Sequence, residues 1–169
     1  MNIQYRQGMM EDLDGVFALV QAAVADMNQN GIPQWDEIYP DRGILEEDIL
    51  KKQLFIGTIE GQMAVIYVLN QECDPEYQDG KWRYPEDSFN IIHRLCVNPA
   101  FQGMGVGRQT EQHIEQVLIQ KGIQSIRLDA FTKNPHALRM YEKLGYEIVG
   151  HADWRKGRFY LMEKHLISA

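Results

Sequence analysis

Apolar residues in the first part of the chain follow two different spacings. Between Met10 and Asn28 they recur every three or four residues, which predicts an amphipathic helix. Asn30-Gly31 and Pro33 predict the end of that helix. Alternation from Asn2 to Arg6 predicts a short strand, and a second, shorter helix is expected near Ile44 to Lys52.

Two apolar runs on either side of Glu60-Gly61 predict a β-hairpin, with strands from Leu54 to Ile59 and from Gln62 to Asn70. Every residue from Met63 to Leu69 is apolar, so this strand is expected to be buried on both faces. The run is much shorter than the roughly 20 residues that a membrane-spanning helix needs. No membrane span or signal peptide is therefore expected, and no membrane partner.

The rest of the chain continues to alternate strands and helices. Polar and aromatic residues predict a loop over 71–87, and a helix that runs to Lys121 follows the glycines at 103–107. The other expected elements are strands at Phe89–Val97, Ile126–Phe131, Tyr146–Gly150 and Arg158–His165, and a helix from Asn134-Pro135 to Gly145. This order predicts a mixed α/β sheet in a single domain over residues 1–169.

Composition and charge narrow the possible functions. Two cysteines, Cys73 and Cys96, without a Cys-x-x-Cys pair, argue against a disulfide framework and a cysteine zinc site and favour the cytoplasm. The net charge of −7 without a basic stripe argues against a nucleic-acid partner. Residues 1–93 carry 17 acidic and 6 basic side chains, whereas residues 94–143 carry 4 acidic and 7 basic. We therefore expect an anion to bind within 94–143 and a cation, if one binds, near the first half.

The most informative segment is the glycine-rich run from Gln102 to Arg108, which lies between a predicted strand and a predicted helix. Glycines allow a positive φ and a close approach to a ligand, and unpaired N–H groups at a helix start attract phosphate. The dinucleotide fingerprint fails because it needs Gly at the position of Arg108, and the Walker pattern fails because no Gly-Lys-Ser/Thr is present. A Gln-x-x-Gly-x-Gly motif after a strand that ends in Val-x-Pro remains.

Three linked motifs in this order resemble the GNAT superfamily of acetyl-CoA-dependent N-acetyltransferases. They are Leu95-x-Val97-Asn98-Pro99, Gln102-x-x-Gly105-x-Gly107 and Asn134-Pro135-x-Ala137-x-x-x-Tyr141-Glu142-Lys143-Leu144-Gly145-Tyr146. The resemblance covers about residues 89–146. It implies the acyl-CoA N-acyltransferase fold, a mostly antiparallel sheet with a splayed parallel strand pair flanked by helices. It also implies acetyl-CoA as the donor, and no metal.

The resemblance assigns the cofactor-binding residues. Backbone groups of Leu95 and Val97 are expected to contact the acetyl carbonyl and the pantetheine amides. Asn134 resembles the family asparagine that contacts the cofactor arm, although a role as helix N-cap is equally expected. The pyrophosphate is expected on the N–H groups of Gln102, Gly103, Met104, Gly105, Val106, Gly107 and Arg108.

Acetyl transfer to an amine needs an acid and a base. The amine, with a pKa of about 10, must lose a proton, and the leaving thiolate must gain one. By the resemblance Tyr141 is the acid, and the alternative is a core aromatic. His93 is a candidate base and shares a strand face with Leu95 if the pleat is regular, or it is a packed histidine. The other candidate bases are Glu86, Asp87, Asp153 and water.

Cys96 points away from Leu95 and Val97 and has no evident base beside it, which favours direct attack in a ternary complex over an acyl-enzyme. The acceptor is expected to be a small-molecule or protein amine, because aromatics stand beside carboxylates. These residues are Trp35-Asp36-Glu37, Tyr77, Trp82, Tyr84, Glu86-Asp87 and Asp153-Trp154. A non-catalytic acyl-CoA sensor is the alternative function, and edge strands at the chain end make a homodimer plausible.

Overall fold

The computed structural model describes residues 1–166, and its backbone contacts divide them into two compact units. The first unit comprises Met1–Leu69 and Arg94–Thr110. The second comprises Asn70–His93 and the described residues from Glu111 onward. A strand (Phe89–Val97) and a helix (Val106–Gln120) run through both units, since boundaries fall after His93 and after Thr110, and another strand (Gln62–Asn70) ends one residue past the boundary after Leu69.

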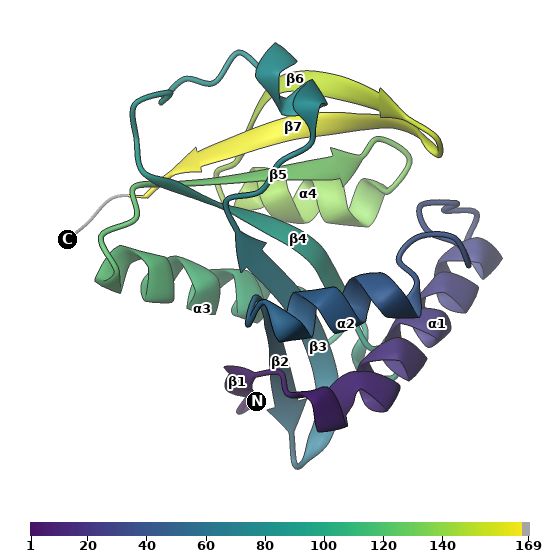
Figure 1. The fold of residues 1–169 in the computed structure, drawn as a ribbon. Helices are drawn as coiled ribbons and strands as arrows, with labels where there is room; N and C mark the ends of the chain where they lie inside the picture. Colours follow the sequence, from purple (N-terminus) through teal and green to yellow (C-terminus); the bar gives the residue numbers. More distant parts are fainter. Residues whose placement is uncertain (167–169) are drawn as a thin grey trace. The chain divides into compact units, whose positions relative to one another are not determined.

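Within residues 1–166, seven strands form one sheet in the order β1-β2-β3-β4-β5-β7-β6 (Figure 1). β4 and β5 pair in parallel from Phe89 opposite Ser125 to Ile91 opposite Arg127. The pairs β1–β2, β2–β3, β5–β7 and β6–β7 are antiparallel. The expected mixed, mostly antiparallel sheet with one parallel pair is therefore confirmed. The strands are β1 (Gln4–Gln7), β2 (Leu54–Ile59), β3 (Gln62–Asn70), β4 (Phe89–Val97), β5 (Ser125–Phe131), β6 (Glu147–Trp154) and β7 (Gly157–His165).

The helices also lie close to the predicted places. The α-helices are α1 (Leu13–Gln29), α2 (Arg42–Leu50), α3 (Val106–Gln120) and α4 (Pro135–Lys143). Short 3₁₀ segments are η1 (Met10–Asp12), η2 (Pro75–Asp79) and η3 (Pro99–Phe101). The segment expected as a loop over 71–87 thus contains one helical turn, and β6 continues four residues past its predicted end at Gly150. None of the helices built from residues 1–166 has the length and apolar character of a membrane span.

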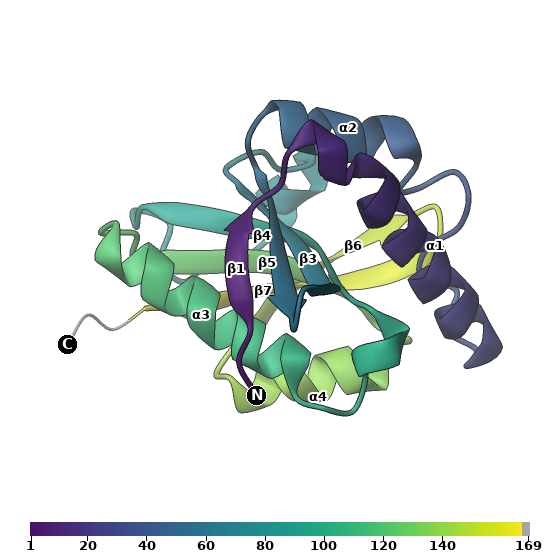
Figure 2. The ribbon, with the colours of Figure 1, turned by 90° about the horizontal axis from the view of Figure 1, so that it is seen from below.

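In the first unit, α1 and α2 lie next to each other and β1 runs along β2 (Figure 2). The apolar stripe of α1 is buried against α2 and β2, in a core that also holds Trp35. A smaller cluster contains Ile3, Ala64, Val65 and Val106. β3 is buried from Ala64 to Asn70, which confirms the prediction from its uninterrupted apolar run. Val106 packs in this cluster and so anchors the start of α3.

In the second unit, α4 packs on β5 and η2 packs on β6 (Figure 1). Tyr77 of η2 is buried in a core with residues of β4, β6 and β7. Its hydroxyl donates to Asp129 of β5 at 2.7 Å, and Trp82 Nε1 donates to the Tyr77 carbonyl at 2.8 Å. Tyr77 and Trp82 therefore hold the 71–87 segment in place against the sheet.

Candidate functional site

The glycine turn belongs to the first unit and precedes α3. Gly103 and Gly105 have φ angles of 75° and 77°, values that disfavour residues with a side chain. Within the described chain, a Cβ added at either glycine would meet no atom within 4 Å. The Gln109 amide donates to the Gly105 carbonyl at 3.0 Å, so the amides before Gln109 have no acceptor inside the helix. The turn thus combines unpaired donors, open space and the positive end of a helix dipole, which suits an anion.

Side chains of the turn differ in exposure in a way that fits this arrangement. Val106 is buried, whereas Gln102, Met104 and Arg108 are exposed. The buried side chain fixes the start of the helix while the exposed backbone stays open to a ligand. The residues present therefore fit a diphosphate group at this turn.

Leu95 and Val97 lie on the last part of β4, in the same unit as the turn. Both are half-buried and pack against the cluster that contains Val106, whereas Cys96 is buried in the core beneath α1 and α2. The two faces predicted for these residues are confirmed. Burial raises the pKa of the Cys96 thiol to about 12, so its reactive thiolate form is scarce near neutral pH.

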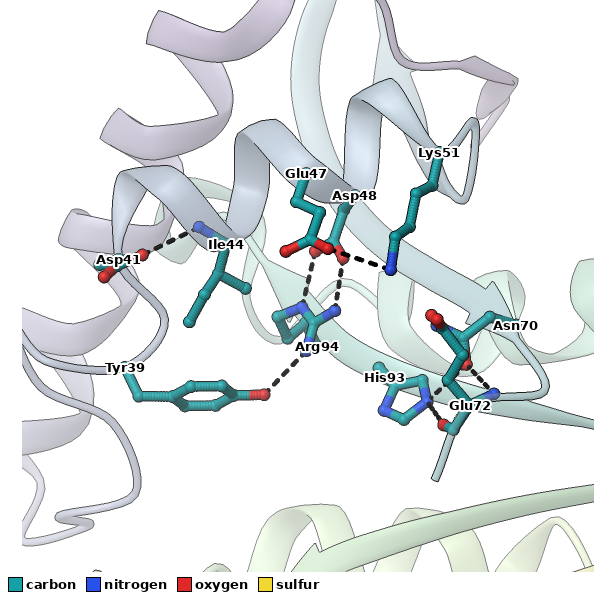
Figure 3. Close-up of polar contacts among 10 residues, drawn as sticks. All are labelled: Tyr39, Asp41, Ile44, Glu47, Asp48, Lys51, Asn70, Glu72, His93 and Arg94. Atoms are coloured by element: carbon teal, nitrogen blue, oxygen red, sulfur yellow. Dashed lines mark hydrogen bonds and ion pairs between the residues drawn. The ribbon is translucent and has the colours of Figure 1, made fainter. Parts of the chain in front are cut away.

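Arg94, just before these residues, was not identified from the sequence. Its φ of 49° interrupts the regular pleat of β4. Its guanidinium binds Asp48 of α2 through two hydrogen bonds, Nε to Oδ2 at 2.8 Å and Nη2 to Oδ1 at 2.6 Å. Nη1 donates to the Tyr39 hydroxyl at 2.8 Å (Figure 3). We expected His93 and Leu95 to share a strand face on the assumption of a regular pleat. The positive φ of Arg94, which lies between them, breaks that pleat, so the expectation no longer has support.

His93 ends the β4 segment of the second unit, and hydrogen bonds orient its ring. Nε2 lies 2.8 Å from Asn70 Oδ1 and 2.9 Å from the Glu72 carbonyl (Figure 3). The same Asn70 oxygen accepts from the Glu72 amide, which identifies it as an acceptor. Nε2 therefore carries the proton, and a neutral His93 has its basic lone pair on Nδ1. Any role as a base uses Nδ1.

Tyr141 lies near the end of α4 in the second unit. Asn134 caps the start of this helix, because its Oδ1 accepts from the Ala137 amide at 3.2 Å. At the other end the Tyr146 amide donates to the Tyr141 carbonyl at 3.0 Å, which turns the chain back and brings the two rings to 5.4 Å, edge to face. Burial raises the pKa of Tyr141 well above its usual value, as do the charges of Glu111 and Asp129. Tyr141 is therefore protonated near neutral pH.

Glu111 of α3 is a further residue that the sequence analysis did not identify. It is completely buried, and its Oε2 accepts from the Tyr146 hydroxyl at 2.9 Å. Its other oxygen, Oε1, has no hydrogen-bond partner among the described residues. Burial raises the pKa of Glu111 to about 8. The only signal in the sequence is that Glu111 stands three and seven positions before the apolar Ile114 and Leu118, which places it on the same face of the helix.

Two of the alternative bases bind their protons weakly. Hydrogen bonds from Ser125 and His165 lower the pKa of Asp87. The guanidinium of Arg158, 2.9 Å from Asp153, lowers the pKa of that carboxyl. Neither carboxylate favours taking a proton from an amine.

The predicted residues fall into two sets. Leu95, Val97 and the run Gln102–Arg108 lie in the first unit, and His93, Asn134 and Tyr141 lie in the second. Residues 1–166 contain no group of three or more histidine, cysteine or acidic side chains arranged to hold a metal ion.

Comparisons with known proteins agree with one another. The model of the acetyltransferase (GNAT) family matches residues 32–146. The chain is 24% identical over 161 residues to the Bacillus subtilis (strain 168) protein named Uncharacterized N-acetyltransferase YesJ, covering 94% of this chain and 87% of that one. A GNAT-family acetyltransferase from Streptococcus agalactiae superposes with a TM-score of 0.85 at 23% identity, covering 96% and 95%. The PaiA N-acetyltransferase from Thermoplasma acidophilum, solved in complex with coenzyme A, superposes with a TM-score of 0.72 at 16% identity. The match covers 98% of this chain and 99% of that one.

Proposed function

Because the chain belongs to the GNAT family of acetyltransferases, we propose that it transfers an acetyl group from acetyl-CoA to a primary amine by direct attack in a ternary complex. The family match spans parts of both units, and we propose that they work as one N-acetyltransferase domain over residues 1–169. The buried, weakly acidic thiol of Cys96 argues against an acyl-enzyme route.

The observation that carries this proposal is the glycine turn. Its positive φ angles at Gly103 and Gly105 leave room for an anion, and its first-turn amides supply donors. The amides from Gly103 to Arg108 would hold the pyrophosphate of CoA, and the exposed Arg108 side chain would add a positive charge. The Gln102 amide, which was also expected to bind it, already donates to the Pro99 carbonyl at 3.2 Å. Backbone groups of Leu95 and Val97 would bind the acetyl carbonyl and the pantetheine arm, and Asn134 would contact that arm.

The chemical step needs a proton donor and a proton acceptor. Acetyl-CoA supplies, when bound, a thioester carbonyl and a thiolate leaving group that must be protonated. As the amine nitrogen forms its bond to the carbonyl carbon and the carbon–sulfur bond breaks, Tyr141 donates its phenolic proton to the sulfur. Burial raises the pKa of Tyr141, so its proton is in place at neutral pH, and the family motif around Tyr141 is what supports its role as the acid.

His93 would accept the proton that the amine loses. Its Nε2 proton is directed to Asn70 and Glu72, which leaves Nδ1 as the basic nitrogen, acting directly or through water. The lowered pKa values of Asp87 and Asp153 make them weaker candidates. The surplus of acidic residues over 1–93 favours a cationic acceptor, either a small amine or a protein amine.

The proposal is tested by a panel of amines incubated with acetyl-CoA while the released thiol is measured. Acetylation of at least one amine is expected, together with stoichiometric CoA release. A protein that binds acetyl-CoA tightly but releases no thiol with small amines, peptides or protein amines would instead favour the acyl-CoA sensor.

Tyr141→Phe tests the assigned acid. Turnover is expected to fall by about 10²–10⁴-fold, the usual contribution of a general acid. CoA affinity should stay nearly unchanged, because the ring and its packing remain. Steady-state kinetics and calorimetry measure the two quantities. Tyr160→Phe, a change of the same kind on β7, is the matched control and should keep normal turnover. If both variants turn over normally, Tyr141 is not the acid.

A further inference from the structure

Glu111 is a buried carboxyl group held by one hydrogen bond. It lies on α3, is 0% exposed, and receives the Tyr146 hydroxyl on Oε2 at 2.9 Å. Oε1 is also buried and has no partner among residues 1–166. A carboxylate in such a place would lose its hydration and gain a single donor in return, which disfavours the charged form strongly.

The groups around Glu111 do not supply the missing countercharge. Lys164 of β7 is the cation near it, and Lys164 forms an ion pair with Glu115 on the same helix. Glu115 adds a second negative charge, and Tyr141 and Tyr146 add neutral phenols. Burial and the negative charge of Glu115 thus outweigh the Tyr146 hydrogen bond and the charge of Lys164, so this carboxyl group is more stable with its proton.

Glu111 also touches the residue pair that contains Tyr141. The Tyr146 hydroxyl binds Glu111, and the Tyr146 ring packs edge to face against Tyr141 at a centroid distance of 5.4 Å. Burial is the largest cause of the raised pKa of Tyr141, and a negative charge on Glu111, when that group is ionised, raises it further, as does Asp129. The protonation state of Glu111 therefore affects the pKa of Tyr141, the phenol that we have proposed as the acid.

We infer that Glu111 is a positioning residue for Tyr141: it keeps its proton in the working enzyme, and in this neutral form it holds Tyr146 against Tyr141 without adding a negative charge beside the phenol. This inference rests on the proposed function. When Glu111 loses its proton, a tyrosinate at Tyr141 becomes harder to form, and protonation of the leaving thiolate slows.

Glu111→Gln is the central test, measured as kcat at saturating substrates across pH. Glutamine keeps an acceptor for the Tyr146 hydroxyl but cannot ionise. Since the pKa of Glu111 is raised to about 8, wild-type kcat should fall on the alkaline side of that value. The ratio of variant to wild-type kcat should rise about tenfold between pH 7 and pH 9. Glu142→Gln is the matched control, because it removes an exposed carboxylate next to Tyr141, and its ratio should stay flat.

Tyr146→Phe gives a second, directional test. It keeps the ring against Tyr141 and removes the hydrogen bond that favours the charged form of Glu111. The alkaline fall in kcat should therefore move to higher pH. A fall at the wild-type pH, or at a lower one, would contradict the inference.

Stability measurements report on Glu111 independently of turnover. Its pKa is about 8 in the folded protein against 4.5 ordinarily, so the folded state binds more protons between these values. The stability that this group contributes is complete below pH 4.5 and is lost as the pH rises toward 8. The midpoint of unfolding of the wild type should therefore decline relative to that of Glu111→Gln over this window. Infrared spectra of the wild type at pH 7 should show a carboxylic acid band that the variant lacks.

The outcomes separate this inference from the proposed function. If Tyr141→Phe turns over normally, the proposed acid fails and the role of Glu111 toward it fails too. If Tyr141→Phe is slow but Glu111→Gln keeps the wild-type pH profile, only the present inference fails. Parallel stability curves, or no carboxylic acid band at pH 7, would overturn the protonated state of Glu111 whatever the enzyme does.

Discussion

Arg94 combines a strained backbone with a buried ion pair. A positive φ is unfavourable for a residue with a long side chain, and it persists only where the surroundings hold it. Here two hydrogen bonds to Asp48 and one to Tyr39 fix the guanidinium. The side chains of Arg94 and Asp48 are only 11% and 7% exposed, so neither charge is well hydrated without the other. This pair fixes β4 immediately before Leu95 and Val97.

Asp48→Asn is expected to lower the free energy of unfolding by about 3–5 kcal/mol, because it leaves the Arg94 charge buried without its partner. Denaturation with urea measures the loss. Glu47→Gln is the matched control, since Glu47 is the preceding residue and its pair with Lys51 at 3.1 Å is largely exposed. That control should cost less than about 1 kcal/mol. Equal losses in the two variants would show that burial of the Arg94 pair does not set its contribution.

The roles of Arg94 and Asp48 could not be predicted from the sequence, and the reason is physical. Arg94 and Asp48 are 46 positions apart, and nothing in the pattern near either predicts their contact. Glycine or asparagine usually signals a positive φ, whereas arginine gives no such signal. Glu111 shows the same limit, because a buried acid is recognised only when its neighbours are known. Tyr141 and Asn134 could be singled out as candidates because a motif and a capping rule mark their positions locally.

At the scale of elements, α3 and α4 show why the local predictions succeeded. Each begins at a residue type that favours a helix start, a glycine turn for α3 and Asn134-Pro135 for α4. Helix-start signals of this kind depend only on neighbouring residues, so they can be identified in the sequence. The far end of β6 was missed because His151 to Trp154 carry no apolar run, and their pairing with β7 depends on residues beyond the turn.

Gly105→Ala tests the function of the turn separately from its conformation. Alanine at a φ of 77° should cost about 1–2 kcal/mol of stability. Gly61 is a matched control, because its φ is 78° and a Cβ there also meets no atom of the described chain within 4 Å. Both alanine variants should be destabilised similarly in denaturation experiments. Only Gly105→Ala should weaken CoA binding, by about tenfold or more, since a hydrogen bond to a charged group contributes about 1.5–3 kcal/mol.

Calorimetric titration with CoA compares the two glycine variants directly. Equal CoA affinity in Gly105→Ala and Gly61→Ala would contradict the assignment of the pyrophosphate to this turn. Loss of CoA binding in both variants would show that lower stability, and not a change at the pyrophosphate site, weakens the binding.

Charge is the property of the whole molecule that bears on its acceptor. The acidic surplus lies in residues 1–93, whereas 94–143 carry more basic than acidic side chains. Several of these acids lie on or beside α1 and α2 with exposed side chains, and their field reaches beyond any single contact. The exposed acids of this region include Glu11, Asp14, Glu37, Asp41 and Glu47. The distribution of charge along the chain, unlike the ion pairs, follows from the sequence alone.

If this field steers a cationic acceptor, kcat/KM should depend on ionic strength and on the charge of the amine. The Debye length falls from about 10 Å at 0.1 M salt to about 3 Å at 1 M, which removes attraction beyond direct contact. With acetyl-CoA kept saturating, so that its own salt dependence is suppressed, kcat/KM for a diamine should fall by about tenfold over this range. A zwitterionic amino acid, tested in parallel, should show little change because its net charge is zero. Equal slopes for the two acceptors would show that the acidic half of the chain serves another purpose than attracting the substrate.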